Sequence, residues 1–265
     1  MKSKPLILKL GGSVITIKDK PYTPNPQVIR RLAEEISRAK PETLLVIHGG
    51  GSFGHPLAHE YNIAKGYREK RQLIGFAKTH QSMVNLNRLV IEALIEQGIA
   101  AVSIPTSSLT ITNNGRIESL MEKTLVGLLD TGFVPVLYGD AVLDSSLGFT
   151  ILSGDQITVH LALRFEAEKM IFGVDVDGLY TEDPKLFPSA RLLREIDLKG
   201  LRDVMKGFSG SRSVDVTGGM WGKVRELIPA IEKGIRVVIT NALKPENVYK
   251  ALIGDEEVGT IIKGS

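Results

Sequence analysis

Two short apolar runs in this chain each end in consecutive glycines, and this pairing strongly constrains what the chain can fold into and bind. The first run, Pro5–Leu10, leads into Gly11-Gly12-Ser13, and the second, Leu44–His48, leads into Gly49-Gly50-Gly51-Ser52. Because glycine has no Cβ, its backbone can approach another group closely and direct an N–H at it. Successive free N–H groups bind anions, and a following helix N-terminus adds partial positive charge. Two such loops predict two anionic groups held side by side, as a phosphoryl transfer requires.

Strand-like and helix-like segments alternate along the chain. Apolar runs predict buried strands at Leu6–Leu10, Leu44–His48, Ile99–Ile104, Phe133–Tyr138, Lys169–Val174 and Ile235–Ile239. Helices are expected at Pro26–Ala39, Ser82–Gln97, Ser119–Asp130, Asp155–Phe165, Gly222–Lys233 and Pro245–Leu252. Asn113-Asn114-Gly115 and Asp144–Gly148 are hairpin turn signals. The alternation predicts an α/β fold with a mainly parallel sheet covered on both faces, and ligands beyond the carboxyl ends of its strands.

The composition narrows the class of protein. The chain has 265 residues, 43% of them hydrophobic, which suffices for one large domain or two small lobes. It has no cysteine, so thiolate chemistry and disulfides are excluded. A net charge of +3 is too small to indicate nucleic acid binding. Neither a membrane span nor a signal peptide is evident, and we expect a cytoplasmic protein.

Lys9 is the one charged residue in the first apolar run. A strand-end lysine can extend its amine to solvent. A buried lysine instead needs an anion, and the adjacent Gly11, Gly12 and Ser13 favour a lysine directed at a transferring phosphate.

His55 lies about one helical turn beyond the second glycine loop, within Ser52-Phe53-Gly54-His55-Pro56. An isolated histidine at such a place usually packs or caps a helix. Beside a phosphate-binding loop it can also donate a hydrogen bond to a phosphate oxygen. His48 is interpreted as structural, and His59, His80 and His160 receive no metal role, because no acidic residues accompany them at metal-ligand spacing.

Three later segments carry similar signals. Ser153-Gly154-Asp155 is predicted to begin a helix. Ser153 or Asp155 can cap that helix, and its N-terminus can also face an anionic substrate; the two roles are compatible. Val174–Pro184 is predicted to be a strand followed by an acidic loop. An ordinary Asp-Gly turn at Asp177-Gly178 is sufficient to explain this pattern. Asp215–Met220 leads into a helix containing Lys223, where the two glycines serve either as a flexible entry or as a binding loop.

Taken together, these motifs resemble the amino acid kinase superfamily over essentially the whole chain. The matching segments, in order, are Lys9–Ser13, His48–Gly51, Gly154-Asp155, Asp175–Tyr180, and Asp215–Met220 with Lys223. The resemblance implies an open three-layer αβα sandwich as the fold. It implies, as the activity, transfer of the γ-phosphoryl group of ATP to a carboxylate, carbamate or phosphate. It also implies an acceptor-binding N-terminal lobe at about residues 1–145 and a nucleotide-binding C-terminal lobe at about 146–265.

Within that superfamily, Gly51–Pro56 and Ser13–Thr16 followed by Lys18 look like the isopentenyl phosphate kinases. This similarity implies phosphorylation of isopentenyl phosphate to isopentenyl diphosphate in isoprenoid biosynthesis, with ATP, Mg²⁺ and a homodimer. A phosphate monoester has a second pKa near about 6, so it is already a nucleophile and needs no general base.

The same resemblance implies roles for individual residues. His55 would bind the acceptor phosphate, and Lys9 and Lys18 would stabilise the transferring group. Backbone N–H groups would hold phosphates at Gly11, Gly12, Gly50, Gly51 and Gly154, with Ser13 beside them. The nucleotide would contact Asp175, Tyr180, Asp183, Gly218 and Lys223. Tyr61–Met83 and Ile104–Ile111 are candidate walls for an apolar tail.

Two alternatives stay open on the residues alone. The same fold could phosphorylate a small phosphonate of the fosfomycin type or an amino acid. It could also serve as a nucleotide sensor without catalytic activity.

Overall fold

The computed structural model describes residues 3–182, 187–209, 218–255 and 257–264. Its strands are β1 (Leu6–Leu10), β2 (Leu44–His48), β3 (Ala101–Ser103), β4 (Thr110–Asn113), β5 (Arg116–Leu120), β6 (Val134–Tyr138), β7 (Asp140–Asp144), β8 (Gly148–Leu152), β9 (Lys169–Val174), β10 (Glu195–Asp197), β11 (Arg236–Asn241) and β12 (Thr260–Lys263).

The helices fill the connections between these strands. They are α1 (Gly12–Ile15), α2 (Pro26–Ala39), α3 (Gly51–Glu60), the 3₁₀ turn η1 (Ile63–Lys65), α4 (Arg71–Glu96), α5 (Thr106–Leu109), α6 (Glu122–Thr131), α7 (Gly154–Phe165), α8 (Leu198–Ser209), α9 (Gly218–Glu232) and α10 (Asn247–Ile253).

A large sheet forms the middle of the molecule, in the strand order β10-β12-β11-β9-β1-β2-β6-β3. Its pairs are parallel except β11 with β12. The β1–β2 register places Lys9 beside Ile47 and Leu10 beside His48, so the two glycine loops leave the sheet side by side. The expected mainly parallel α/β sheet is confirmed.

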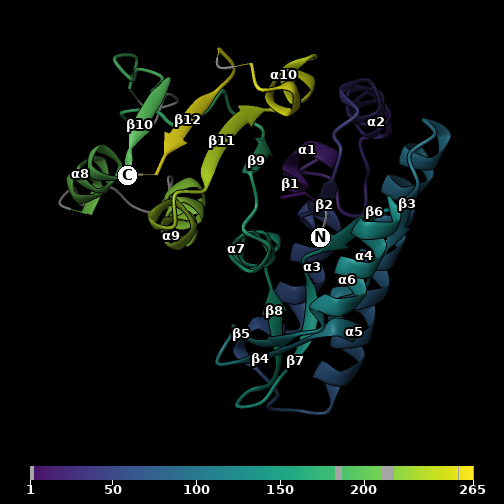
Figure 1. Cartoon of the computed structure of the whole chain (residues 1–265). Coiled ribbons are helices and arrows are strands. Elements are labelled where there is room, and N and C mark those ends of the chain that lie inside the picture. Colours follow the sequence, from purple (N-terminus) through teal and green to yellow (C-terminus); the bar gives the residue numbers. More distant parts are fainter. Residues whose placement is uncertain (1–2, 183–186, 210–217, 256, 265) are drawn as a thin grey trace.

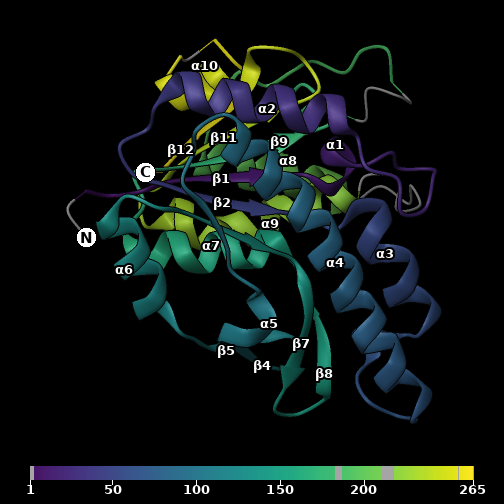
Figure 2. The ribbon, with the colours of Figure 1, turned by 90° about the vertical axis from the view of Figure 1, so that its right-hand side faces the viewer.

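Each face of this sheet has its own core, because successive residues of a strand point to opposite faces. Leu8 and Val46 pack with α2, α4 and α10, whereas Ile7 and Ile47 pack with α6, α7 and α9. Figure 2 shows α2 and α10 on one side of the sheet and α7 and α9 on the other. The chain therefore has the predicted three-layer arrangement.

A second, four-stranded sheet has the order β5-β4-β7-β8 and lies beside α3, α4 and α5 (Figure 1). Its two hairpins turn at Asn114-Gly115 and at Asp144–Gly148, where the turns were predicted. One buried carboxylate, that of Asp144, accepts hydrogen bonds from Thr112 Oγ1 and from the backbone N–H groups of Asn114, Gly115, Ser146 and Leu147. A single side chain thus joins both turns.

Some predicted boundaries were wrong. The helix expected to start at Ser119 starts at Glu122, since Arg116–Leu120 pairs with β4 as strand β5. The helix expected from Ser82 begins at Arg71, and α9 begins at Gly218 rather than Gly222. No helix in the described part of the chain is both long enough and apolar enough to cross a bilayer.

Candidate active site

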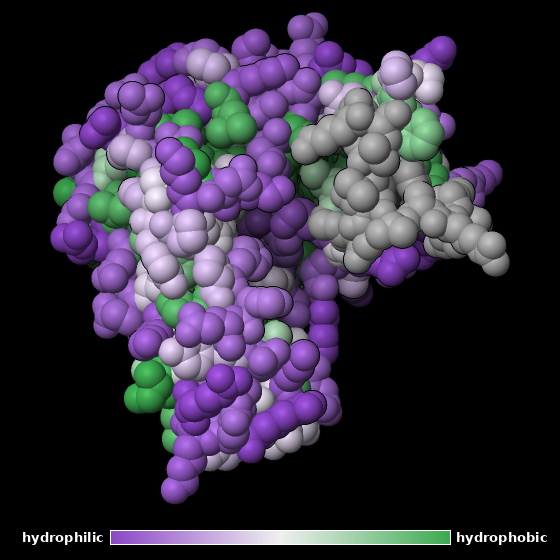
Figure 3. Space-filling model, turned by 180° about the vertical axis from the view of Figure 1, so that it is seen from behind, coloured by the Kyte–Doolittle hydropathy of each residue, from purple (hydrophilic) through white to green (hydrophobic). Residues whose placement is uncertain are grey.

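A cavity of about 840 Å³ opens at the carboxyl ends of the central strands. Three helices begin at its wall with a glycine, namely α1 at Gly12, α3 at Gly51 and α7 at Gly154. The first N–H groups of a helix have no partner within that helix, so each start offers donors to an anion. Figure 3 shows the side opposite to Figure 1, where the surface is hollowed near its middle and hydrophilic residues lie in and above the hollow.

The two glycine loops touch each other. A Cβ on Gly12 would overlap the backbone of Gly51, and a Cβ on Gly49 would lie 2.8 Å from the Gly12 nitrogen. Gly51 also has a φ of +48°, which disfavours other residues. Thr16 ties the loops together: its Oγ1 donates to the Gly12 carbonyl and accepts from the N–H of Ser52. These glycines are needed for loop-to-loop packing as well as for any ligand.

Lys9 does not extend to solvent. Strand alternation directs its side chain to the face covered by α7, where it is 3% exposed. Its Nζ lies 2.8 Å from Asp155 Oδ1, at the start of α7. Lys223 of α9 approaches the other oxygen, with its Nζ 2.6 Å from Asp155 Oδ2. One carboxylate therefore holds two ammonium groups at the cavity wall.

The electrostatics of this trio follow from burial and proximity. Burial lowers the pKa of Lys9, and the Asp155 carboxylate partly offsets that effect. Burial alone would raise the pKa of Asp155, but Lys9 and Lys223 hold it at about 2. Asp155 is thus ionised at neutral pH, and the side-chain amines of two lysines share its one carboxylate at the cavity wall. Such a site favours an anionic ligand.

His55 lies on α3 and is exposed at the cavity wall. Its pKa is lowered, first by desolvation and then by Lys223 and Lys9. A neutral imidazole keeps one N–H donor and one acceptor nitrogen. An anion that entered between His55 and the lysines would offset their charge and favour the protonated form, which has two donors.

His48, the last residue of β2, contacts the glycine loop that follows it. It is fully buried and stacks on Tyr138, and its Nδ1 lies 3.1 Å from the Gly49 carbonyl. Asn87 lies 3.1 Å from its Nε2 and in turn accepts a hydrogen bond from Ser103. Desolvation lowers the pKa of His48 to about 4, so the ring is neutral and donates to the loop. This geometry fits the predicted structural role.

The structure brings most of the predicted site residues to one cavity. Its lining includes Lys9, Gly11, Gly12, Ser13, Lys18, Gly50, Gly51, His55, Gly154, Asp175, Tyr180 and Lys223. Asp183 lies outside the described residues, and for Gly218 only its place at the start of α9 is described.

Sequence reasoning missed two features of the site. It left the helix cap open between Ser153 and Asp155, and it did not foresee the two lysine partners of Asp155; Ser153 supplies the cap by accepting from the N–H of Gln156. It gave His80 no acidic partner, yet His80 Nδ1 lies 2.7 Å from Asp140 Oδ2, and Asp140 lines the cavity. For Asp155, the Gly154-Asp155 motif was a sequence signal that the residue belongs to the site. For the His80–Asp140 pair, there was no signal in the sequence.

The apolar part of the cavity differs in part from expectation. Thr79 and Met83 line it, within the predicted range Tyr61–Met83. The second predicted range, Ile104–Ile111, contributes no lining residue; Ile151 and Leu152 of β8 are there instead. The β7–β8 hairpin therefore supplies the wall that the 104–111 segment was expected to form.

The fold and this cavity define a class of protein, and comparisons with known proteins agree. Residues 4–241 match the model of the amino acid kinase family. The chain therefore belongs to the amino acid kinase family and is a kinase.

Within this family the chain groups with the isopentenyl phosphate kinases. It is 45% identical to the one from Methanothermobacter thermautotrophicus, covering 98% of this chain and 99% of that protein. It is 36% identical to the one from Thermoplasma acidophilum, covering 97% and 100%. A crystal structure of an isopentenyl phosphate kinase superposes with a TM-score of 0.86 at 42% identity, covering 97% of this chain and 99% of that one.

Proposed function

We propose that this kinase transfers the γ-phosphoryl group of ATP to isopentenyl phosphate, giving isopentenyl diphosphate and ADP. The observation that carries the proposal is the meeting of His55, the Lys9–Asp155–Lys223 trio and three glycine helix starts in one cavity whose remaining wall is partly apolar. Similarity to isopentenyl phosphate kinases of nearly the same length supports the choice of acceptor.

The two substrates would lie in the two lobes expected from the sequence. The acceptor phosphate would bind beside His55 and Gly50 in the lobe at about residues 1–145. The nucleotide would lie toward Asp175, Tyr180 and Lys223, in the lobe at about residues 146–265. Gly154, at the start of α7, would direct its backbone N–H at the transferring phosphoryl group.

In the proposed reaction, an oxygen of the acceptor phosphate attacks the γ-phosphorus of ATP. A new P–O bond forms while the bond to the β–γ bridging oxygen breaks, and ADP leaves with that electron pair. The acceptor is already anionic at neutral pH, so no general base is required. Lys9 and Lys18 would stabilise charge on the transferring group, and Asp155 would fix the position of Lys9. His55 would donate a hydrogen bond to the acceptor.

Mg²⁺ fits this site as an ion carried on the nucleotide phosphates. Among the described residues, no three histidine, aspartate or glutamate side chains are grouped to hold a metal. Asp155 is engaged by two lysines, but Asp175 at the end of β9 would serve as a single protein ligand. Magnesium commonly binds through one or two carboxylates plus phosphates, and it would neutralise phosphate charge there. A homodimer and a cytoplasmic location also remain predictions.

A coupled ADP-release assay tests the choice of acceptor. Isopentenyl phosphate, dimethylallyl phosphate, fosfomycin, glutamate and carbamate would be compared at equal ATP and Mg²⁺ concentrations. We expect the highest kcat/KM with isopentenyl phosphate. Preferential turnover of fosfomycin or glutamate would replace the acceptor but keep the enzyme class. Binding of ATP without turnover of any acceptor would support the sensor alternative.

A further inference from the structure

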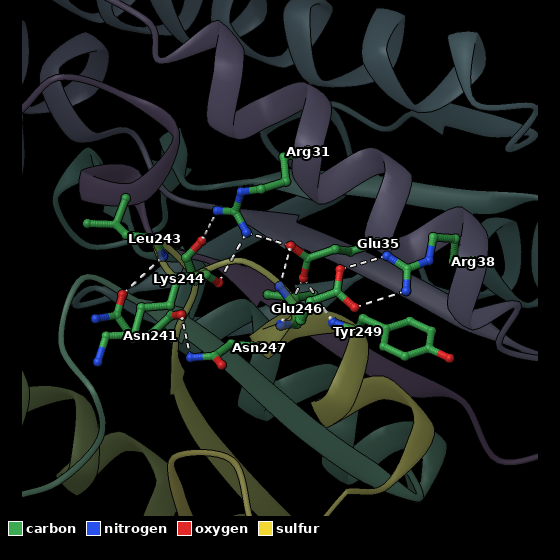
Figure 4. A network of polar contacts seen from close by, with 11 residues as sticks. Arg31, Glu35, Arg38, Asn241, Leu243, Lys244, Glu246, Asn247 and Tyr249 are labelled. Atoms are coloured by element: carbon green, nitrogen blue, oxygen red, sulfur yellow. Dashed lines mark hydrogen bonds and ion pairs between the residues drawn. The ribbon is translucent and has the colours of Figure 1, made fainter.

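Three charged side chains on one face of α2 meet the segment that joins β11 to α10, and none of the three lines the cavity. Arg31, Glu35 and Arg38 have the i, i+4, i+7 spacing of one helical stripe. Figure 4 shows all three directed at residues 241–249. Nothing in the proposed phosphoryl transfer uses this network.

Glu35 is 1% exposed and caps a helix other than its own. Its Oε1 accepts from the N–H of Glu246 at 3.1 Å, and its Oε2 accepts from those of Val248 and Tyr249, each at 3.0 Å. These are N–H groups at the start of α10, which has no side-chain cap within its own segment. The negative charge is also favourable at a helix N-terminus.

Arg31 holds the other end of the same segment. It donates to Glu35 Oε1, to the carbonyl of Ala242 and, at 3.1 Å, to the carbonyl of Lys244. Arg31 and Glu35 thus bind carbonyls where the segment leaves β11 and N–H groups where it enters α10. Arg38 differs, because its paired hydrogen bonds to Glu246 lie in solvent with both side chains about half exposed.

The opposite side of this segment contacts the cavity wall. Asn241 Nδ2 donates to Asp177 Oδ1 at 2.9 Å, and Lys244 Nζ lies 2.7 Å from the same oxygen. The N–H of Ala242 donates to the carbonyl of Val174 at 2.8 Å. Asp177 belongs to the segment Asp175–Tyr180, whose other five residues all line the cavity.

We propose that Arg31 and Glu35 are positioning residues for the nucleotide side of the cavity, acting through the 241–249 segment and Asp177. The inference rests on the proposed function in placing ATP against Asp175–Tyr180. If Glu35 loses its charge, the start of α10 loses its cap and the carbonyls held by Arg31 are released. Asn241 and Lys244 then no longer hold Asp177 in one place. The expected consequence is weaker ATP binding, with an unaltered acceptor site.

The test is steady-state kinetics on Glu35→Gln, with Arg38→Gln as the matched control on the same helix face. For Glu35→Gln we expect the KM for ATP to rise about tenfold, with kcat and the acceptor KM within twofold of the native enzyme. The glutamine retains the shape but presents an NH₂ donor to backbone N–H groups. For Arg38→Gln all three parameters should stay within twofold.

A second variant separates positioning from stability. Asp177→Asn leaves α2 and α10 intact, and we expect the same rise in the KM for ATP. In the double variant, the KM for ATP should be less than twofold higher than in the more affected single variant, because both residues act in one chain of contacts. If Glu35→Gln does not fold, Arg31→Gln replaces it in the kinetics, and an unchanged KM for ATP in either Arg31→Gln or Asp177→Asn overturns the inference.

Two results for Glu35→Gln would overturn the inference. One is a lower Tm with an unchanged KM for ATP. The other is an equal rise in the KM for ATP and the KM for the acceptor. Failure of the proposed function is distinguishable, because it is measured on the native enzyme. If the native enzyme prefers another acceptor, the KM for ATP is measured with that acceptor. If it transfers no phosphoryl group, direct titration with ATP replaces the KM, and an unchanged Kd in Glu35→Gln overturns the inference.

Discussion

At the scale of single residues, Asp155 determines where two lysines lie. Lys9 and His55 could be found from sequence, since each sits next to a glycine loop that signals its chemistry. The role of Asp155 could not, because Ser153-Gly154-Asp155 has the same pattern as an ordinary helix start. Its partners come from β1 and α9, and only the fold brings them together.

Replacing His55 by alanine should remove the donor to the acceptor phosphate. We expect kcat/KM for isopentenyl phosphate to fall at least 100-fold, within the range seen when a group that stabilises a transition state is deleted. The Tm should change little, since the side chain is exposed. His59→Ala is the matched control: His59 is exposed on the same helix but does not line the cavity. Equal activity of both variants would remove His55 from the mechanism.

Asp155→Asn should affect both stability and catalysis. Lys9 would remain buried without a counter-charge, and removing one partner of a buried pair costs about 3 kcal/mol. We expect urea unfolding at pH 7 to show that loss, and kcat to fall more than the affinity for ATP. Glu166→Gln, which breaks an exposed ion pair with Lys4, should change stability by less than about 1 kcal/mol. A stable, fully active Asp155→Asn enzyme would contradict the assigned role.

At the scale of elements, the cavity depends on short connections that local sequence encodes well. Glycines and hairpin turn residues require particular backbone shapes, so the loops after β1 and β2 and both hairpins of the small sheet were predictable. The start of α6 was not. Residues 116–120 extend as β5 because they pair with β4, and because Gln156 of α7 hydrogen-bonds to Ile117 and Gly115. These partners are tertiary contacts that no local pattern reports.

The contact between the glycine loops predicts the effect of one added methyl group. In Gly12→Ala the new Cβ would overlap the Gly51 backbone, so the loops must separate. We expect kcat/KM to fall at least tenfold and the Tm to drop. Gly127→Ala is the control, because Gly127 lies in α6 with open space around it. There alanine should stabilise the protein by about 0.5–1 kcal/mol through helix propensity. A Gly12→Ala enzyme with native kinetics would refute the tight loop contact.

Asp144 should make the small sheet sensitive to acid. Burial alone would raise its pKa, but hydrogen bonds from Gly115, Leu147, Thr112 and Ser146 lower it to about 2. A depressed carboxyl pKa contributes stability that is complete above its unfolded value near about 4 and is lost as the pH falls toward 2. We expect Asp144→Asn to lose about 2 kcal/mol at pH 7 and progressively less below pH 4, by urea unfolding. A pH-independent difference would contradict this assignment.

At the scale of the whole molecule, the eight-stranded sheet brings distant segments to one cavity. Alternating apolar runs made its parallel character predictable, and register places the two glycine loops together. The hydrogen bonds from Arg31 and Glu35 of α2 to the start of α10 and the segment before it were not predictable. Glu35 and Val248 are 213 residues apart, and each looks ordinary in its own segment. Sequence patterns therefore identified the residues that line the cavity better than the residues that hold them in place.

The central claim is that the acceptor is itself a phosphate, and ³¹P NMR of the reaction tests it directly. With ATP, Mg²⁺ and isopentenyl phosphate, the account predicts loss of the monophosphate signal and growth of two coupled doublets, which report a new P–O–P bond, together with ADP. Under the same conditions His55→Ala should form this product at least 100 times more slowly. Release of inorganic phosphate with the monophosphate signal unchanged would contradict the claim.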